Sequence, residues 1–397
     1  MKKRKFAWLS VLWTILFCAL LAVPCAAEDI NLSDEINDIT AYYYDRYSDT
    51  LQSGQSDPEA FRPYIADSYS IVPLLSVNLL NKTEQVISIT QIEDSADAFS
   101  YAQLLIQRLA LDLDPHADFN GLDPLAHLSE LQQPDGSFAG CTLSENIFCF
   151  ITLRAAQTRV GESDVVYSSR NANDYLLGLQ GQDGSWESDA VVTAWALTYL
   201  SYFTETVSDC ADAVDRGVAY LQSQQQENGL FAGHETAYET AVIVCGLTDA
   251  GESLHTAQYH DLPVVMKQFK NEDASYRTTL DGEHTADLQA TAGALAAFDG
   301  VANQQSCWMK LMQNGSFSDN LLQKLWPVLV IFGILAALSV VFWCFMLFGK
   351  LKFRHTDEGG SILKNPEGMT RAQQCAPRCT LSEEELAQQD DPPTKTD

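Results

Sequence analysis

Apolar residues recur every three or four positions from residue 96 to about residue 320, which is the spacing of one face of an α-helix. Between Tyr175 and Phe203, YLLGLQGQDGSWESDAVVTAWALTYLSYF, one helix ends, a turn follows at Gln182–Ser185, and a second helix opens at Asp189. Ala, Leu and Gln dominate where a sheet would carry Val, Ile and Thr, so a four-stranded propeller blade of similar length is disfavoured. The pattern predicts a helix, a turn and a helix.

This unit recurs along the chain, and each turn carries one aromatic residue. The repeat-turn aromatics are Phe138, Trp186, Phe231 and Tyr276, which lie 48, 45 and 45 residues apart. A period of this length is typical of helix-pair repeats. Two interpretations are open for these side chains: packing wedges between outer helices, which we favour, or a stacking surface for a ligand. An incomplete further unit is predicted from Trp308 to Phe317.

Acidic residues mark the starts of the second helices. They are Asp97, Glu145, Asp189, Glu235 and Asp287, with Thr236 rather than Glu235 at the first position of its helix. In this alignment Glu145 stands four residues before Cys149, as Asp189 does before Thr193. Small and apolar runs follow, such as Ala194–Leu197, and small residues let helices approach closely, so the second helices are predicted to be the inner ones.

These acidic residues have two interpretations. As helix caps, they would satisfy free N–H groups and complement the helix dipole. As a cavity rim, where five helices meet around one mouth, they would select cationic or polyhydroxylated ligands. Capping alone is the simpler interpretation, and both stay open.

The start of the chain has the pattern of a targeting signal. Residues 1–27 combine the basic stretch Met1–Lys5 with an apolar stretch and small residues before Glu28, which predicts a cleaved signal peptide. A lipoprotein signal ending at Cys25 is disfavoured, because Pro24 stands where a small residue is required. The mature chain is then predicted to begin with an N-terminal helical segment at residues 28–95.

The far end has the pattern of a membrane span. Leu325–Phe348 contains no charged residue in 24 positions, enough for a helix to cross the hydrocarbon of a bilayer. Lys350, Lys352 and Arg354 follow at once, so the positive-inside rule places the C-terminus in the cytoplasm. Residues 349–397 lack the apolar content of a core and are predicted to be a disordered cytoplasmic tail. We therefore expect a single-pass cell-membrane protein with its main domain outside.

Charge and cysteine content narrow the choice of partners. A net charge of −29 argues against nucleic acid as a partner and against docking on anionic lipid. Five of the ten cysteines lie between the signal and the span. The number is odd, so at least one thiol is unpaired, and it is too small for a dense disulfide scaffold. The expected partners are the bilayer, through Leu325–Phe348, and an unidentified small molecule or surface protein.

The repeats also resemble a known superfamily. LQQPDGSFAG at residues 131–140, LQGQDGSWESD at 179–189 and DAVVTAWALTYL at 189–200 are similar to the repeats of the prenyltransferase and squalene-cyclase superfamily. Residues 111–140 are most similar to bacterial secreted members related to the cobalamin carriers. The resemblance implies an all-α fold, an incomplete α/α toroid, with repeats at residues 96–320 and inner helices around a cavity.

The catalytic motifs of that superfamily are absent. The cyclase acid D-x-D-D has its nearest match at Asp112–Pro115, where Pro replaces the last Asp. His284 and Asp287 open an inner helix as the prenyltransferase zinc histidine does, yet no Asp-x-Cys precedes them, so we expect no metal and place His284 on the rim. Gly140-Cys141 lacks the Gln of a complement-type thioester. No cofactor is expected.

These observations predict a non-catalytic module that binds a ligand or partner. Two alternatives stay open: a terpene-cyclase or prenyltransferase type of enzyme with non-standard acids, and a structural spacer at the cell surface. A filled, dry centre without a pocket would favour the spacer.

Overall fold

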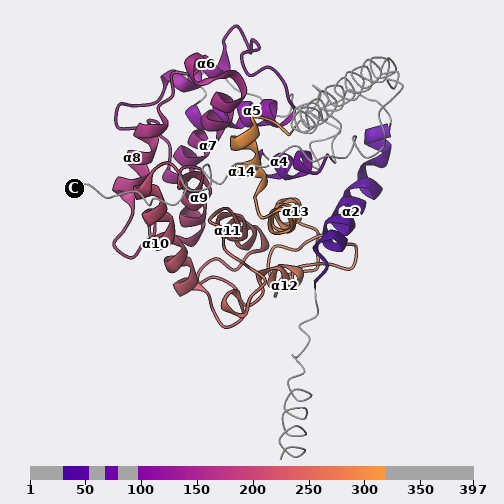
Figure 1. Ribbon diagram of the computed structural model, residues 1–397. Helices are drawn as coiled ribbons and strands as arrows, with labels where there is room; N and C mark the ends of the chain where they lie inside the picture. Colours follow the sequence, from indigo (N-terminus) through magenta and orange to yellow (C-terminus); the bar gives the residue numbers. More distant parts are fainter. Residues whose placement is uncertain (1–29, 53–67, 79–96, 318–397) are drawn as a thin grey trace, which may run out of the picture. The chain divides into compact units, whose positions relative to one another are not determined.

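The computed structural model describes residues 30–52, 68–78 and 97–317 (Figure 1). The chain is all-α in these ranges, which confirms the all-α part of the predicted fold class: they contain no strand, and the β-type pairings among them are isolated bridges in turns. No helix within the described ranges combines the length and apolar character that crossing a bilayer requires. The predicted signal peptide, the span Leu325–Phe348 and the tail at residues 349–397 lie outside these ranges.

Six helices contact one another in a closed cycle and are called the inner helices below. Each contacts the next in chain order, and α13 contacts α4 again. The inner helices are α4 (Ser68–Ser76), α5 (Ala98–Ala110), α7 (Leu143–Val160), α9 (Ala190–Ser201), α11 (Ala237–Asp249) and α13 (Leu288–Asn303). In α9 every residue from Val192 to Leu200 is buried, as expected for a helix that is apolar on all sides. The prediction that these second helices lie inside is supported by this burial.

Five further helices each contact one or two of the inner helices and are called the outer helices. Short α6 contacts α5 and α7, α8 contacts α7, α10 contacts α9, α12 contacts α11 and α13, and α2 contacts α13. They are α2 (Leu32–Gln52), α6 (Pro124–Glu130), α8 (Ser169–Leu179), α10 (Ser208–Gln224) and α12 (Leu262–Lys267). Inner and outer helices therefore alternate from α5 to α13, as the repeat predicts.

Close helix approach depends on small residues at two contacts. A Cβ atom on Gly246 of α11 would lie 2.5 Å from the carbonyl oxygen of Ala194 on α9. A Cβ atom on Gly293 of α13 would lie 3.2 Å from the Cβ of Ala241 on α11. The small residues in the sequence pattern thus mark places where backbones meet.

In three of the four units, a glutamine at the start of the turn joins that unit to the next. The Nε2 of Gln180 donates to the carbonyl oxygens of Gly184 in its own turn, at 2.9 Å, and of Ala213 in α10, at 2.8 Å. The same double hydrogen bond recurs at Gln132 and Gln225. In the fourth unit Lys270 takes this place and donates instead to the carboxylates of Glu35 and Asp38 on α2. Helix α2 is therefore joined to the last unit by charge.

The last described helix, α14 (Cys307–Asn314), does not form a further helix pair. It contacts the inner helices α4, α7, α9 and α13, and Figure 1 draws it among them. Thr158 of α7 donates to the carbonyl oxygen of Met312 at 2.7 Å, and Lys310 pairs with Asp299 of α13 at 2.7 Å. The segment from Trp308 to Phe317 thus packs on the inner helices instead of beginning a new unit.

Candidate functional site

Three of the predicted rim acids cap inner helices. Asp97, Asp189 and Asp287 are the N-cap residues of α5, α9 and α13. Each side chain accepts from the backbone N–H three residues later, at 2.8, 2.9 and 2.8 Å. The capping interpretation is confirmed at these positions. Capping uses one oxygen of each carboxylate and so does not exclude a second role.

At α7 the predicted alignment is wrong by three residues. The N-cap is Thr142, and Glu145 lies three positions into the helix, where its carboxylate accepts from the Thr142 N–H at 2.7 Å in a capping box. The position matched to Thr193 is Asn146, not Cys149: the Phe138 N–H donates to Asn146 Oδ1, as the Trp186 N–H donates to Thr193 Oγ1. The signature Thr142-Leu-Ser-Glu145 could have revealed this alignment.

At the start of α11, a second capping box brings Glu239 to the helix end, and Glu239 takes the place in the rim that the sequence assigned to Glu235. Thr236 caps the helix and Glu239 accepts from the Thr236 N–H at 3.2 Å, whereas exposed Glu235 accepts only from the side chain of Gln226. His234 lies between neighbouring units, with Nε2 3.3 Å from Asp189 Oδ2 and Nδ1 3.1 Å from Glu239 Oε1. Sequence analysis missed Glu239 and His234, although Thr236-x-x-Glu239 has the capping-box spacing.

Contacts connect other rim residues across units. Thr278 donates through Oγ1 to Asp287 Oδ2 at 2.9 Å, and its carbonyl oxygen accepts from the Ala237 N–H at the start of α11. The hydrogen bond with Cys149 lowers the pKa of the Cys141 thiol, while the charges of Glu145 and Asp97 act to raise it. Both carboxylates therefore lie near Cys141. The starts of α5 and α7, of α9 and α11, and of α11 and α13 are therefore neighbours, and the rim below means Asp97, Glu145, Asp189, Glu239 and Asp287.

His284 does not form part of a metal centre in the described residues. Its side chain is exposed, and Arg277 Nη1 lies 2.6 Å from its Nδ1. No group of three or more His, Cys, Asp or Glu among the described residues could hold a metal ion.

The four repeat-turn aromatics are buried in the positions of packing residues. Phe138, Trp186, Phe231 and Tyr276 are at most 2% exposed. Trp186 donates from Nε1 to the Leu176 carbonyl of α8, and a Cβ atom on Gly217 of α10 would lie 3.2 Å from its ring. Trp186 therefore fills the space between two outer helices.

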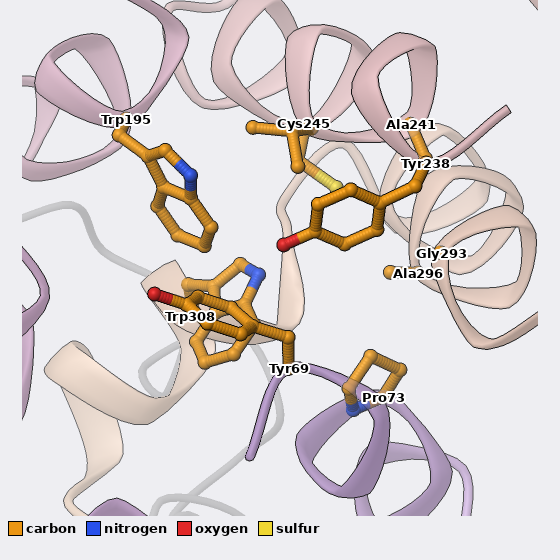
Figure 2. A pocket seen from close by; sticks show the side chains of 10 residues that line it. Tyr69, Pro73, Trp195, Tyr238, Ala241, Cys245, Gly293, Ala296 and Trp308 are labelled. Carbon is orange, nitrogen blue, oxygen red and sulfur yellow. The ribbon is translucent and has the colours of Figure 1, made fainter. Parts of the chain in front are cut away.

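A pocket lies between the inner helices and α14, and we call it the central pocket. Figure 2 shows that its side chains come from α4, α9, α11, α13 and α14. The cavity measures about 20 Å³, within about 260 Å³ of unfilled space that includes solvent at its open side. A cavity of this size holds about one water molecule. Its lining residues are Tyr69, Pro73, Trp195, Tyr238, Ala241, Val242, Cys245, Gly293, Ala296 and Trp308.

Aromatic rings dominate this pocket. The ring centroid of Tyr69 lies 5.6 Å from that of Trp195, 6.3 Å from that of Tyr238 and 6.1 Å from that of Trp308. The rings of Trp195 and Trp308 meet edge to face at 5.3 Å. Sequence analysis missed this cluster, because its members come from four helices spread over more than 200 residues of the sequence.

The pocket contains no activated nucleophile among its lining residues. Cys245 is its one thiol, and burial raises the pKa of that thiol well above its usual value, so the protonated form persists. No other lining residue carries a carboxylate, amine or imidazole group. The arrangement offers contact surface and ring faces, which suit binding more than covalent chemistry.

The rim and the pocket are connected through the inner helices. Trp195 stands six residues after Asp189 on α9, and Gly293 stands six residues after Asp287 on α13, which is about 9 Å along a helix axis. Tyr238 lies in the first turn of α11, beside Glu239. Asp189, Glu239 and Asp287 thus lie toward the N-terminal ends of three helices that line the pocket, α9, α11 and α13. Helices α5 and α7, which carry Asp97 and Glu145 near their starts, contribute no lining residue.

No protein-family model matches this sequence, and no curated protein matches it.

Proposed function

We propose that this chain is a non-catalytic binding module, an α/α toroid of helix-pair repeats displayed outside the cell and anchored by Leu325–Phe348. The observation that carries the proposal is the closed cycle of inner helices around an aromatic pocket, with a carboxylate near the start of three of the lining helices. Such a pocket among converging helices is where small-molecule sites usually lie. Its lining offers no acid, base or nucleophile for catalysis.

The enzyme alternative has less support from the pocket. Pockets for drug-sized ligands usually measure roughly 300–1,000 Å³, and a polyprenyl chain needs a pocket of that order. The central cavity measures about 20 Å³. A cyclase or prenyltransferase would need the aromatic cluster and α14 to move apart before its substrate could enter.

A structural spacer is the second candidate, because the centre is largely filled. Trp308 is 4% exposed and Trp195 is 6% exposed, and both contact Tyr69 in the middle of the cycle. A spacer requires only that the repeats remain rigid. It requires no ligand at all.

Ligand retention separates these candidates. The full chain, purified from membranes in a mild detergent, is analysed by native mass spectrometry, with Trp195→Ala as the matched variant. A binding module carries or takes up a small molecule that the variant loses. A spacer carries none, and turnover of a prenyl diphosphate would favour the enzyme.

The proposed topology has its own test. Protease added to intact cells should degrade the domain at residues 28–320 while an epitope placed after residue 390 stays protected. Degradation of that epitope in intact cells would contradict an outside domain with an inside tail.

A further inference from the structure

We propose that Cys141 is a site of covalent modification, where its thiol exchanges with a small, positively charged disulfide to form a mixed disulfide. Cys141 directly precedes Thr142, the N-cap of α7, and is half-buried, so a small reagent can reach its sulfur. Its thiol is free, and the buried thiol of Cys149 on α7 is also free. The inference does not depend on the proposed binding function.

Two hydrogen-bond donors stabilise the thiolate form of Cys141. The S–H of Cys149 donates to the Cys141 sulfur, and the backbone N–H of Phe99 also donates to it. Phe99 is the second residue of α5, where backbone N–H groups have no partner within the helix. Asp97 Oδ1 accepts from the Ser100 N–H there and leaves the Phe99 N–H to the sulfur. Cys141 therefore lies at the positive end of a helix, an environment that activates thiols.

The other four cysteines of the described residues lack this activation. The hydrogen bond from Cys149 lowers the pKa of the Cys141 thiol against the opposing effect of burial. Burial raises the pKa of each of the other four thiols, to about 11 at Cys210. These four are Cys149, Cys210, Cys245 and Cys307. Because the thiolate is the form that attacks a disulfide, Cys141 should react first among the described cysteines.

Two carboxylates beside Cys141 select a positively charged reagent. Glu145 lies in the first turn of α7 and Asp97 caps α5, and the charges of both act on the Cys141 thiol. Such charges attract a cationic disulfide and repel an anionic one. The chemical class of the reagent is therefore a small disulfide that carries ammonium groups.

The exchange needs no separate oxidant. Cys141 releases its proton, and the thiolate attacks one sulfur of the reagent. The S–S bond of the reagent breaks as the new S–S bond forms, and the other half leaves as a thiolate that takes up a proton. One disulfide is consumed and one is formed, so the electrons balance.

Cys149 acts as a hydrogen-bond donor and not as a disulfide partner. It lies seven residues after Thr142, about 10 Å along the axis of α7. Disulfide-bonded cysteines have Cα atoms only about 4.4 to 6.8 Å apart. Since Cys141 precedes Thr142, a bridge to Cys149 would distort the start of α7. The expected product is therefore the mixed disulfide.

The probe is cystamine, a disulfide with two ammonium groups. The matched control is bis(2-hydroxyethyl) disulfide, which has the same length and no charge. The full chain, reduced and purified in a maltoside detergent, is treated with each reagent, and peptide mass spectrometry follows each cysteine over time. Each rate is divided by that of a neutral model thiol, N-acetylcysteinamide, which removes the intrinsic difference between the reagents. We expect Cys141 to prefer cystamine by at least about 5-fold at low salt, and salt should reduce this preference.

Variants test the parts played by Cys149 and Glu145. Cys149→Ala removes the donor, so the pH midpoint for modification of Cys141 by the neutral reagent should rise. At pH 7 the rate should fall by about 3-fold for a tenfold loss of thiolate, because a more basic thiolate is also more nucleophilic. Cys149→Ser keeps a donor and should restore most of the rate. Glu145→Gln keeps the capping-box spacing and removes a charge, so it should reduce the preference for cystamine.

Four results would contradict the proposal. Modification of Cys141 no faster than that of buried Cys210 would overturn the assignment of the site. An unchanged pH midpoint in Cys149→Ala would overturn the activation by Cys149, and equal corrected rates for the two reagents would overturn the selection of a cation. A bridge between Cys141 and Cys149 as the final product would overturn the mixed disulfide. None of these results depends on ligand retention, so this inference and the binding function fail separately.

Discussion

Asp249, the last residue of α11, holds Ser306, the N-cap of α14. Its carboxylate oxygens accept from the backbone N–H and the hydroxyl of Ser306 at 2.8 and 2.6 Å. Burial raises the pKa of Asp249 to about 7, although hydrogen bonds from Ser306 and Thr198 and the charge of Lys310 oppose the rise. The start of the helix that closes the central pocket is therefore held by a carboxyl group that titrates near neutral pH.

This pKa predicts a pH-dependent stability. The folded pKa of about 7 lies above the ordinary value of 3.8, so the folded state binds an extra proton between these values. The contribution of Asp249 to stability is thus greatest below about pH 4 and is lost as the pH rises through about 7, by at most about 4 kcal/mol. Asp249→Asn should lack this loss.

Urea unfolding of both proteins from pH 4 to pH 8 checks the prediction. The free energy of unfolding of the wild type should fall relative to that of Asp249→Asn across this range. A constant difference between the two curves would show that Asp249 titrates at its ordinary pKa.

Features that depend on local sequence were predictable. The spacing of apolar residues, the Asp-Gly turn and the N-cap Asp189 lie within one unit, and the structure has α9 at Ala190–Ser201 as that pattern requires. The alignment of α7 failed because an acid near a helix start can be the cap or its partner three residues on. Glu145 is the partner and Thr142 is the cap.

Features that depend on distant contacts were not predictable. Tyr69 meets Trp308 only because the cycle of inner helices brings their segments together. Nothing in the residues around Trp308 distinguishes the start of a further unit from a helix that packs on α7. Its direction is set by Ser306 and Lys310, whose partners Asp249 and Asp299 lie on two other helices.

The turn glycine of each unit predicts a sharp difference between two substitutions. Gly184 has a φ of +90°, and an added Cβ atom would collide with the backbone of Arg216 on α10. Gly184→Ala should cost about 3 kcal/mol or more, because strain and overpacking add. Gly233 has a φ of +76° but no atom within 4 Å of an added Cβ, so Gly233→Ala should cost about 1 to 2 kcal/mol. Thermal unfolding of the two variants measures the difference, and equal losses would contradict the close contact.

A glutamine that joins two units should contribute more to stability than an exposed glutamine in the same kind of turn. Gln180 is part-buried and donates to two carbonyl oxygens, while Arg216 donates to its Oε1. Gln180→Leu should cost about 2 to 3 kcal/mol, since it leaves these groups without their partner. Gln133 is exposed and its side chain donates only to the Leu131 carbonyl oxygen, so Gln133→Leu should change stability by less than about 1 kcal/mol. Denaturant unfolding checks both, and a cost at Gln133 as large as at Gln180 would show that the double hydrogen bond is unimportant.

Lys270 replaces that glutamine in the fourth unit, and its substitution should loosen α2. Lys270 Nζ lies 2.6 Å from carboxylate oxygens of both Glu35 and Asp38, and Lys267 lies 2.9 Å from Glu35. Burial raises the pKa of Glu35, but hydrogen bonds and charges from Lys270 and Lys267 outweigh burial and hold that pKa below its usual value. The stability from Glu35 is therefore present above its unfolded pKa of about 4.5 and is lost as the pH falls through the lower folded pKa.

Lys270→Gln restores the residue of the other three units and removes the main partner of a buried carboxylate. We expect a loss of about 2 kcal/mol at pH 7, less than for a wholly unpaired charge because Lys267 remains. The double variant Glu35→Gln with Lys270→Gln should regain part of this loss, since no buried charge is then left. Hydrogen exchange at pH 7 should show faster exchange in α2 of the single variant, while α9 stays protected. A double variant less stable than Lys270→Gln would mean that Glu35 still has enough partners, and that charge does not hold α2 to the last unit.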